Sequence, residues 1–211
     1  MERPVDVLTG LVSGVELNTE MEALIAKGEE FAYAKADIDM LSYINRDFSH
    51  EAGDEVFRCV AKHLLTVFPS PSQIFRSTRD EFDILLPGSP KEEAFLKAEE
   101  ARKLINQDKL NYKSSDGKAL TQSVSIGISS FPDDGSRPGD IIRRADSAMV
   151  RAKKNGRNQV CLAREEKLLP KTSHYTSAQL EKLSHIAEKE KIGEAVLLRE
   201  ALDDLLRKYD E

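Results

Sequence analysis

Acidic residues stand at two places in this sequence where they could bind a divalent cation together. Asp37 closes the apolar run FAYAKAD, and Asp80 stands at a tight turn between two strand-like segments, QIFRS and EFDILL. An acid at a strand end and an acid at a hairpin tip can meet in space, and oxygen atoms are the ligands that hard divalent cations take in proteins. This arrangement predicts a cation site at one end of a sheet.

The elements that must position these acids follow from the hydrophobic periodicity. Between the two acids, a helical segment carries Asn45 and His50 and is followed by Asp54. Apolar residues at three-and-four spacing predict helices, and short apolar runs bounded by Pro, Gly or polar clusters predict strands. Helices are expected over 15–28, 51–68, 90–105 and 138–156, and strands over 31–39, 73–77, 81–86, 121–131 and 158–163. Strands that alternate with helices indicate an α/β fold with a central sheet flanked by helices.

Composition narrows the class of protein. The chain has 211 residues, which suits one domain with a small appendix. It contains no run of about 20 apolar residues that could cross a bilayer, and its first residues lack the pattern of a signal peptide. Two cysteines far apart in sequence suggest no disulfide framework. We therefore expect a cytoplasmic protein without a membrane segment, and a net charge of -6 argues against nonspecific coating of nucleic acid.

Six separated blocks resemble the GGDEF domain of diguanylate cyclases over roughly residues 4–163. The blocks are DVLTGL, DIDMLSYIN, GD, the turn TRDEF, SVSIGIS and AKKNGRN, in the order of the family. The resemblance implies the nucleotidyl-cyclase-like fold and a Mg²⁺ ion held by Asp37, Asp80 and the carbonyl of Ile38. It also implies that Asn45 and Asp54 read a guanine base, and that Lys153 and Arg157 bind phosphates through charge-assisted bonds.

Three departures from the family pattern predict a degenerate domain. The turn reads Thr78, Arg79, Asp80, Glu81 and Phe82, so the two family glycines are replaced by residues that should crowd a nucleotide. Ser42 stands where the family places a lysine. Pro69 and Ser72 replace an Arg-x-x-Asp motif that serves product inhibition in the family. No catalytic residue is therefore expected in the turn, although guanine-nucleotide binding can survive without catalysis.

Several of these residues also have a purely structural interpretation. Asp37 and Asp54 could cap helices, where acids are common. Lys153, Lys154 and Arg157 could form a solvated helix end that is favourable to the helix dipole.

The C-terminal part changes character after a charged, proline-containing linker at residues 164–170. The segment KTSHYT precedes helices expected over 177–190 and 193–209, and residues 171–211 resemble a ribbon–helix–helix domain of small bacterial repressors and antitoxins. In that family two chains pair their strands into a ribbon that enters the major groove. Alternation along the strand would place Lys171, Ser173 and Tyr175 on the DNA-binding face. The segment carries nine acidic and seven basic residues, so a helical dimerisation hairpin without a DNA role is the alternative.

Together these features predict a homodimeric transcriptional regulator with a degenerate GGDEF domain at 1–163 and a ribbon–helix–helix domain at 171–211. DNA, a guanine nucleotide (GTP or cyclic di-GMP) and a second copy of the chain are the expected partners. Mg²⁺ is the expected cofactor where nucleotide binding is retained. The alternatives are a diguanylate cyclase that joins two GTP molecules and a dimeric protein-interaction module.

Overall fold

The structure is a computed structural model that describes residues 4–77, 80–164, 171–190 and 193–209. The chain divides into two compact units, Met1–Glu166 and Lys167–Glu211. Within the described residues, no helix is both long enough and apolar enough to cross a membrane.

A mixed sheet forms the centre of the first unit, and the described residues contribute six strands to it. The strands are β1 (Val12–Ser13), β2 (Phe31–Ile38), β3 (Gln73–Arg76), β4 (Glu81–Pro87), β5 (Val124–Phe131) and β6 (Val160–Leu162). Their spatial order is β1-β3-β4-β2-β5-β6. The central strand β2 is antiparallel to both β4 and β5, whereas the outer pairs β1–β3 and β5–β6 are parallel. This sheet, with helices on both sides, confirms the predicted α/β fold.

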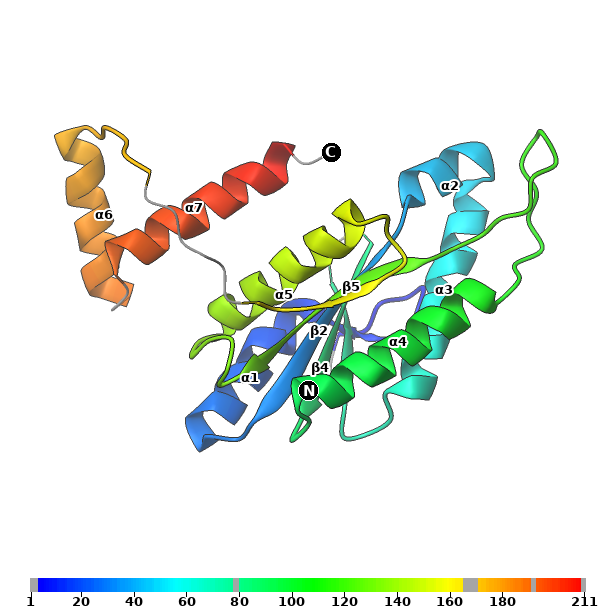
Figure 1. Ribbon diagram of the computed structural model, residues 1–211, viewed down its shortest axis with the longest axis horizontal. Coiled ribbons are helices and arrows are strands. Elements are labelled where there is room, and N and C mark those ends of the chain that lie inside the picture. Colours follow the sequence, from blue (N-terminus) through cyan, green and yellow to red (C-terminus); the bar gives the residue numbers. More distant parts are fainter. Residues whose placement is uncertain (1–3, 78–79, 165–170, 191–192, 210–211) are drawn as a thin grey trace. The chain divides into compact units, whose positions relative to one another are not determined.

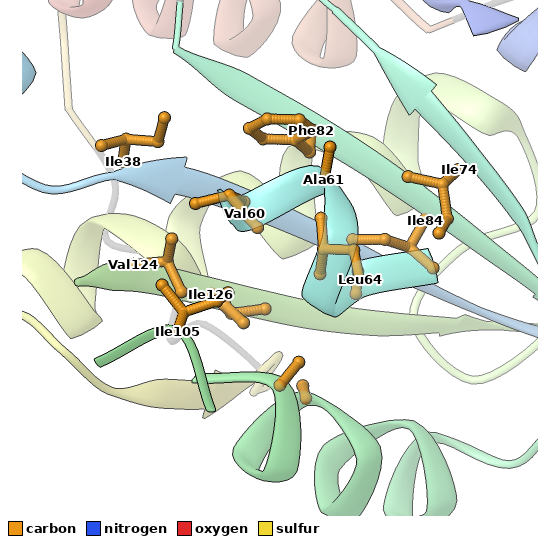
Figure 2. Packing of buried hydrophobic residues seen from close by; sticks show 14 of the residues in the cluster. Ile38, Val60, Ala61, Leu64, Ile74, Phe82, Ile84, Ile105, Val124 and Ile126 are labelled. Carbon is orange, nitrogen blue, oxygen red and sulfur yellow. The ribbon is translucent and has the colours of Figure 1, made fainter. Parts of the chain in front are cut away.

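Helices cover both faces of this sheet (Figure 1). The described helices of the first unit are η1 (Gly14–Glu16, a 3₁₀ turn), α1 (Leu17–Lys27), α2 (Leu41–Asp47), α3 (His50–Val67), α4 (Lys91–Gln107) and α5 (Pro138–Lys154). The helices α3 and α4 pack on one face, and α1 and α5 pack on the other. The larger apolar core lies beneath α3 and α4, where side chains of α3 point towards β2, β4 and β5 (Figure 2).

Strand β2 is buried along its whole length and faces the two cores alternately. Ala32, Ala34, Ala36 and Ile38 belong to the core under α3 and α4, whereas Phe31 and Tyr33 belong to the core under α1 and α5. Because successive side chains of a strand point to opposite faces, Lys35 and Asp37 lie on the α5 side. Gly127 of β5 allows α5 to approach closely, since a Cβ atom there would overlap the carbonyl oxygen of Ala145.

The helical region after β2 is interrupted, which the sequence pattern did not predict. Helix α2 ends at Asp47, and α3 begins at His50 after the N-cap residue Ser49. The Ser49 hydroxyl accepts a hydrogen bond from the Ala52 N–H at 3.1 Å, which satisfies one free donor of the helix start. Asn45 and Asp54 therefore lie on two different helices, α2 and α3.

The second unit consists of helices α6 (Ser177–Glu190) and α7 (Glu194–Tyr209). Thr176 and Gln179 form a reciprocal capping box, in which each side chain bonds to the backbone N–H of the other. This arrangement fixes the start of α6 at the predicted place. Residues 171–176 adopt no strand in the single chain. Since the predicted ribbon needs a strand from a second chain, the alternation along this segment stays a prediction.

Candidate functional site

Asp37 lies near the end of β2 and is buried, with Glu81 and Ser125 as its neighbours on the adjacent strands. Its carboxylate forms an ion pair with Lys153 of α5, with 2.8 Å between Nζ and Oδ2. Burial raises the pKa of Asp37 to about 7; Lys153 opposes this shift, and the negative charges of Asp80 and Glu81 add to it. The carboxylate is therefore held in a partly dehydrated place where a cation is favourable.

Asp80 is tied to the same end of the sheet. The Ile38 N–H donates to the Asp80 carbonyl at 3.1 Å, so the turn and the end of β2 are joined through the backbone. The carboxylates of Asp37 and Asp80, with the Ile38 carbonyl, offer only oxygen atoms, which is the donor chemistry that Mg²⁺ prefers. The residues present thus fit such an ion. Thr78 and Arg79, on which the prediction of degeneracy depends, lie outside the described residues.

The two strands that flank the turn are joined by hydrogen bonds to the Glu81 carbonyl. Ser77 N–H and the Arg76 guanidinium both donate to the Glu81 carbonyl, at 3.2 and 3.0 Å. The Arg76 guanidinium also lies over the rings of Phe57 and Phe82, at 4.1 and 5.0 Å from their centroids. Cation–π contacts of this kind fix the side chain against the core. The hairpin therefore enters and leaves the turn at fixed positions.

Asn45 of α2 packs against α3 at Gly53. A Cβ atom at Gly53 would overlap the Asn45 Oδ1 atom and would lie 3.1 Å from Asn45 Cγ. The absence of a side chain lets the Asn45 amide pack against α3 at Gly53, the residue before Asp54 in the sequence. Asp54 stands inside α3, and Ser49 caps this helix, so the capping interpretation of Asp54 is wrong. The same holds for Asp37, which lies inside a strand.

The two basic residues at the end of α5 have different surroundings. Lys153 pairs with the buried Asp37, so it is not merely part of a solvated helix end. Arg157 follows the helix with a φ of 64° and lines a pocket of about 310 Å³. Asp39, Met40, Tyr43, Ile44, Thr121 and Ser123 complete this pocket. The structure therefore brings Asp37, Asp80 and Lys153 together and leaves Arg157 facing an open space beside the end of β2.

A buried polar network beneath α5 is missing from the sequence-based prediction. The Lys35 ammonium lies 3.1 Å from Glu81 and 3.2 Å from Asp146. Burial would lower the pKa of Lys35, but the charges of Asp146 and Glu81 outweigh it and raise the pKa. Asp83 accepts hydrogen bonds from the hydroxyls of Tyr33 and Ser77. Glu81, the second acid of the turn, is thus paired with Lys35 inside the protein.

Asp39 has a similar structural role at the start of the pocket. Its carboxylate accepts hydrogen bonds from the hydroxyls of Ser123 and Ser125, both at 2.7 Å, and from the Asn158 N–H at 3.0 Å. These bonds hold the segment after α5 against the sheet. The signal for this buried polar network in the sequence was the presence of charged residues within an apolar run, as in FAYAKADID, residues 31–39.

Lys171, Ser173 and Tyr175 are all exposed and precede α6. Tyr175 is among the large apolar side chains that remain open to solvent in the second unit. The structure of one chain leaves their proposed DNA-binding role a prediction.

Two family models match separate parts of the chain. Residues 4–159 match the model described as "Diguanylate cyclase, GGDEF domain", and residues 168–210 match the model described as "Ribbon-helix-helix domain". The chain is 34% identical over 145 residues to Diguanylate cyclase A of Treponema denticola, covering 69% of this chain and 38% of that protein. It is 33% identical over 163 residues to Diguanylate cyclase DgcP of Pseudomonas aeruginosa, covering 75% and 24%. The chain thus spans less than half the length of these curated relatives.

Solved structures agree with the family models. The GGDEF domain of DgcB from Caulobacter crescentus, solved in complex with c-di-GMP, superposes with a TM-score of 0.67 at 26% identity, covering 77% of this chain and 98% of that domain. A PA1120 fragment from Pseudomonas aeruginosa that comprises only the GGDEF domain gives a TM-score of 0.69 at 26% identity, covering 76% and 95%. With its six-stranded sheet, its helices and these matches, the chain belongs to the GGDEF diguanylate cyclase family and carries a ribbon–helix–helix domain at its C-terminal end.

Proposed function

We propose that this chain is a dimeric transcriptional regulator that binds DNA through its ribbon–helix–helix domain. Its GGDEF domain, residues 1–163, serves as a catalytically degenerate sensor of a guanine nucleotide or as a scaffold. A linker at 164–170 joins it to the DNA-binding domain at 171–211. The observation that carries this proposal is the joining of a ribbon–helix–helix match to a GGDEF turn that lacks both glycines.

The exposed apolar side chains of α7 support dimerisation. They are Leu202, Leu205, Leu206 and Tyr209, each at least half exposed in the single chain. A two-helix segment of this length buries too little surface to be stable alone, so a second copy is the economical partner. Pairing of residues 171–176 from two chains would then supply the ribbon. Lys171, Ser173 and Tyr175 would face the major groove, where each specific base contact contributes about 1–3 kcal/mol of discrimination.

The nucleotide would bind across the end of the sheet. In this proposal Asn45 and Asp54 pair with the guanine edge, and Arg157 binds phosphate oxygens from the pocket side. Mg²⁺ would be held by Asp37, Asp80 and the Ile38 carbonyl, and when bound it would offset phosphate charge. Lys153 would leave Asp37 for a phosphate, because the ion takes over its role of neutralising that carboxylate.

Nucleotide binding would change DNA affinity only if it favours one of two states of the protein. The coupling is reciprocal, so DNA would change nucleotide affinity by the same factor. The ligand of this sensor is a guanine nucleotide, either GTP or cyclic di-GMP, the compound that the DgcB structure contains.

Selection from a random DNA pool tests the proposal. We expect recovery of a palindromic or repeated half-site, because a symmetric dimer uses each contact twice. The double variant Lys171→Ala/Tyr175→Ala should lose this enrichment. The matched control Thr172→Ala/His174→Ala changes the opposite face of the strand and should retain it. No enrichment at low salt, with or without nucleotide, would contradict the proposal and leave a dimeric protein-interaction module.

A diguanylate cyclase is the second candidate, and the grouping of Asp37, Asp80 and Lys153 favours it. Thr78 and Arg79 oppose it, because glycines at the turn serve close approach of the backbone to a ligand. We expect incubation with GTP and Mg²⁺ to leave GTP unchanged. Steady formation of cyclic di-GMP, lost in Asp80→Ala, would instead establish the enzyme.

A further inference from the structure

Three side chains of different chemistry converge between α3 and the end of α4. Cys59 and His63 belong to α3, and Asp108 is the first residue after α4. The Asp108 Oδ2 atom lies 2.8 Å from His63 Nε2 and 3.8 Å from Cys59 Sγ. One ligand atom from each of the three residues lies within 4.8 Å of the other two. None of these residues takes part in the candidate nucleotide site.

The backbone places these groups firmly. Cys59 and His63 are four residues apart and therefore share one face of the helix. The Asp108 N–H donates to the Leu104 carbonyl at 3.0 Å, which closes the last turn of α4. The buried Gln122 donates from Nε2 to the carbonyls of Ile105 and Asp108, both at 2.7 Å.

Gln122 also lies beside the cysteine, with 3.8 Å between Nε2 and Cys59 Sγ. It is 1% exposed, and its Oε1 is one of the buried polar atoms of the described residues that have no hydrogen-bond partner. The Gln122 side-chain amide thus binds the backbone carbonyl of Asp108 and also lies against Cys59. Such outer contacts orient the side chains of metal sites.

A thiolate, an imidazole and a carboxylate form a donor set that suits Zn²⁺ among the biological divalent cations. Direct contacts to the carboxylate alone account for His63 and for the exposed Lys62, whose Nζ lies 3.4 Å from Asp108 Oδ2. This pair of contacts does not include Cys59, which is 5% exposed and whose thiol donates a long hydrogen bond, 3.8 Å, to the same carboxylate oxygen.

We propose that Cys59, His63 and Asp108 bind one Zn²⁺ ion per chain. Three protein ligands leave a fourth position for water or another ligand. The bound ion would join α3, the helix that carries Asp54, to the C-terminal end of α4. Such a zinc site would be independent of the proposed regulatory function.

Titration of the metal-free full chain with Co²⁺ tests the site, because Co²⁺ reports sulfur ligation directly. We expect one equivalent to produce a thiolate-to-cobalt charge-transfer band in the near ultraviolet, and Zn²⁺ to abolish it by displacement. The Cys59→Ala variant should lose the band, and His63→Gln should weaken binding by at least about 100-fold, the upper limit for loss of an outer contact. The control Cys161→Ser, which removes the other cysteine, should leave the charge-transfer band and the Co²⁺ affinity unchanged.

A second variant tests the sign of the local charge. Lys62 has a 69% exposed side chain, so Lys62→Ala should not disturb folding. Removal of its positive charge should tighten Co²⁺ binding by about two- to fivefold, the size of an exposed charge interaction. Absence of the thiolate band in the wild-type chain would overturn the proposal, as would its persistence in Cys59→Ala or its loss in Cys161→Ser. These outcomes would leave the group as an ion pair beside a buried thiol.

Discussion

Gly53 makes room for the amide of Asn45, one of the two residues proposed to read the guanine base. A methyl group at this position would displace only the end of the Asn45 side chain, so the fold should tolerate it. The displaced amide, however, would leave the position against α3 from which it is proposed to contact the base. Binding and folding can therefore be separated at this residue.

We predict that Asp54→Ala and Gly53→Ala both weaken GTP binding by about one to two decades. A buried base edge left unpaired costs about 1–3 kcal/mol, and ~1.4 kcal/mol is tenfold in affinity. Calorimetric titration at fixed Mg²⁺ measures this loss. Gly139→Ala is the matched control, because a Cβ atom there would meet nothing within 4 Å. Unchanged affinity in both site variants would place the nucleotide elsewhere.

Asp37 gives the stability of the metal-free chain a pH dependence of defined sign. Its pKa is about 7 when folded against an ordinary value of 3.8, because burial disfavours the charged form. Between these values the folded chain holds a proton that the unfolded chain has released. The contribution of Asp37 to stability therefore falls as pH rises from about 4 to about 7, and is constant outside that range.

We predict that Asp37→Asn gains stability relative to wild type over this pH window, because the amide cannot ionise. Urea unfolding at several pH values, in the presence of a chelator, measures the free-energy difference between the two proteins. A difference that stays constant between pH 4 and 7 would contradict the assigned pKa.

At the scale of elements, β2, β4 and α5 are joined by the buried ion pairs of Lys35. Removing one partner of a buried charge pair leaves the other uncompensated, which costs about 3–5 kcal/mol. We predict that Lys35→Met lowers the free energy of unfolding by this amount, because it keeps the volume of the side chain but removes the charge that faces Glu81 and Asp146. Denaturant unfolding measures it.

Lys27→Met is the control for this loss. The Lys27 side chain is 64% exposed and lies 3.9 Å from Glu29, and exposed pairs of this kind contribute at most about 1 kcal/mol. Equal losses in the two variants would show that the buried network contributes no more than a surface pair.

Much of this arrangement of elements could be predicted from periodicity, and the exceptions have physical reasons. The helix expected from Pro138 begins there, and the hairpin strands lie where QIFRS and EFDILL placed them. Strand β1 has only two residues, too few to show the alternation of apolar and polar residues that marks a strand, and it pairs with β3, which is far away in sequence. The break between α2 and α3 falls at the N-cap residue Ser49, a local signal that the apolar period does not carry.

The site was predictable only where local pattern or family resemblance reached it. The resemblance named Asp37, Asp80 and Lys153, but periodicity alone could not pair residues so far apart in sequence. Lys35 was visible as a charge in an apolar run, yet its partners come from another strand and from α5. Cys59 and His63 stand four residues apart on one helix, whereas Asp108 is brought to them only by the packing of α4.

For the whole molecule, the exposed apolar face of α7 predicts where self-association occurs. A chain that ends at Leu169 should sediment as a monomer or associate only weakly, because this face is lost with the second unit. The full chain should sediment as a dimer. A truncated chain that stays as tightly dimeric would move the interface to the GGDEF domain.

A matched pair of variants tests the same prediction in the intact chain. Leu202 in α7 and Leu65 in α3 are both 53% exposed. Leu202→Glu should dissociate the dimer, because it would bury a charge at the predicted interface. Leu65→Glu adds the same charge outside that interface and should leave the dimer intact.

The two faces of β2 also bear on how the sheet reaches its native alignment during folding. A slip of one residue against β4 or β5 would turn Lys35 and Asp37 into the apolar core and leave alanines beneath α5. Placing unpaired charges in an apolar interior is far more costly than misplacing methyl groups. Because β2 lies between two antiparallel partners, the same two charges penalise a misaligned pairing on either side. They thereby favour the native alignment of β2 against both of its partners.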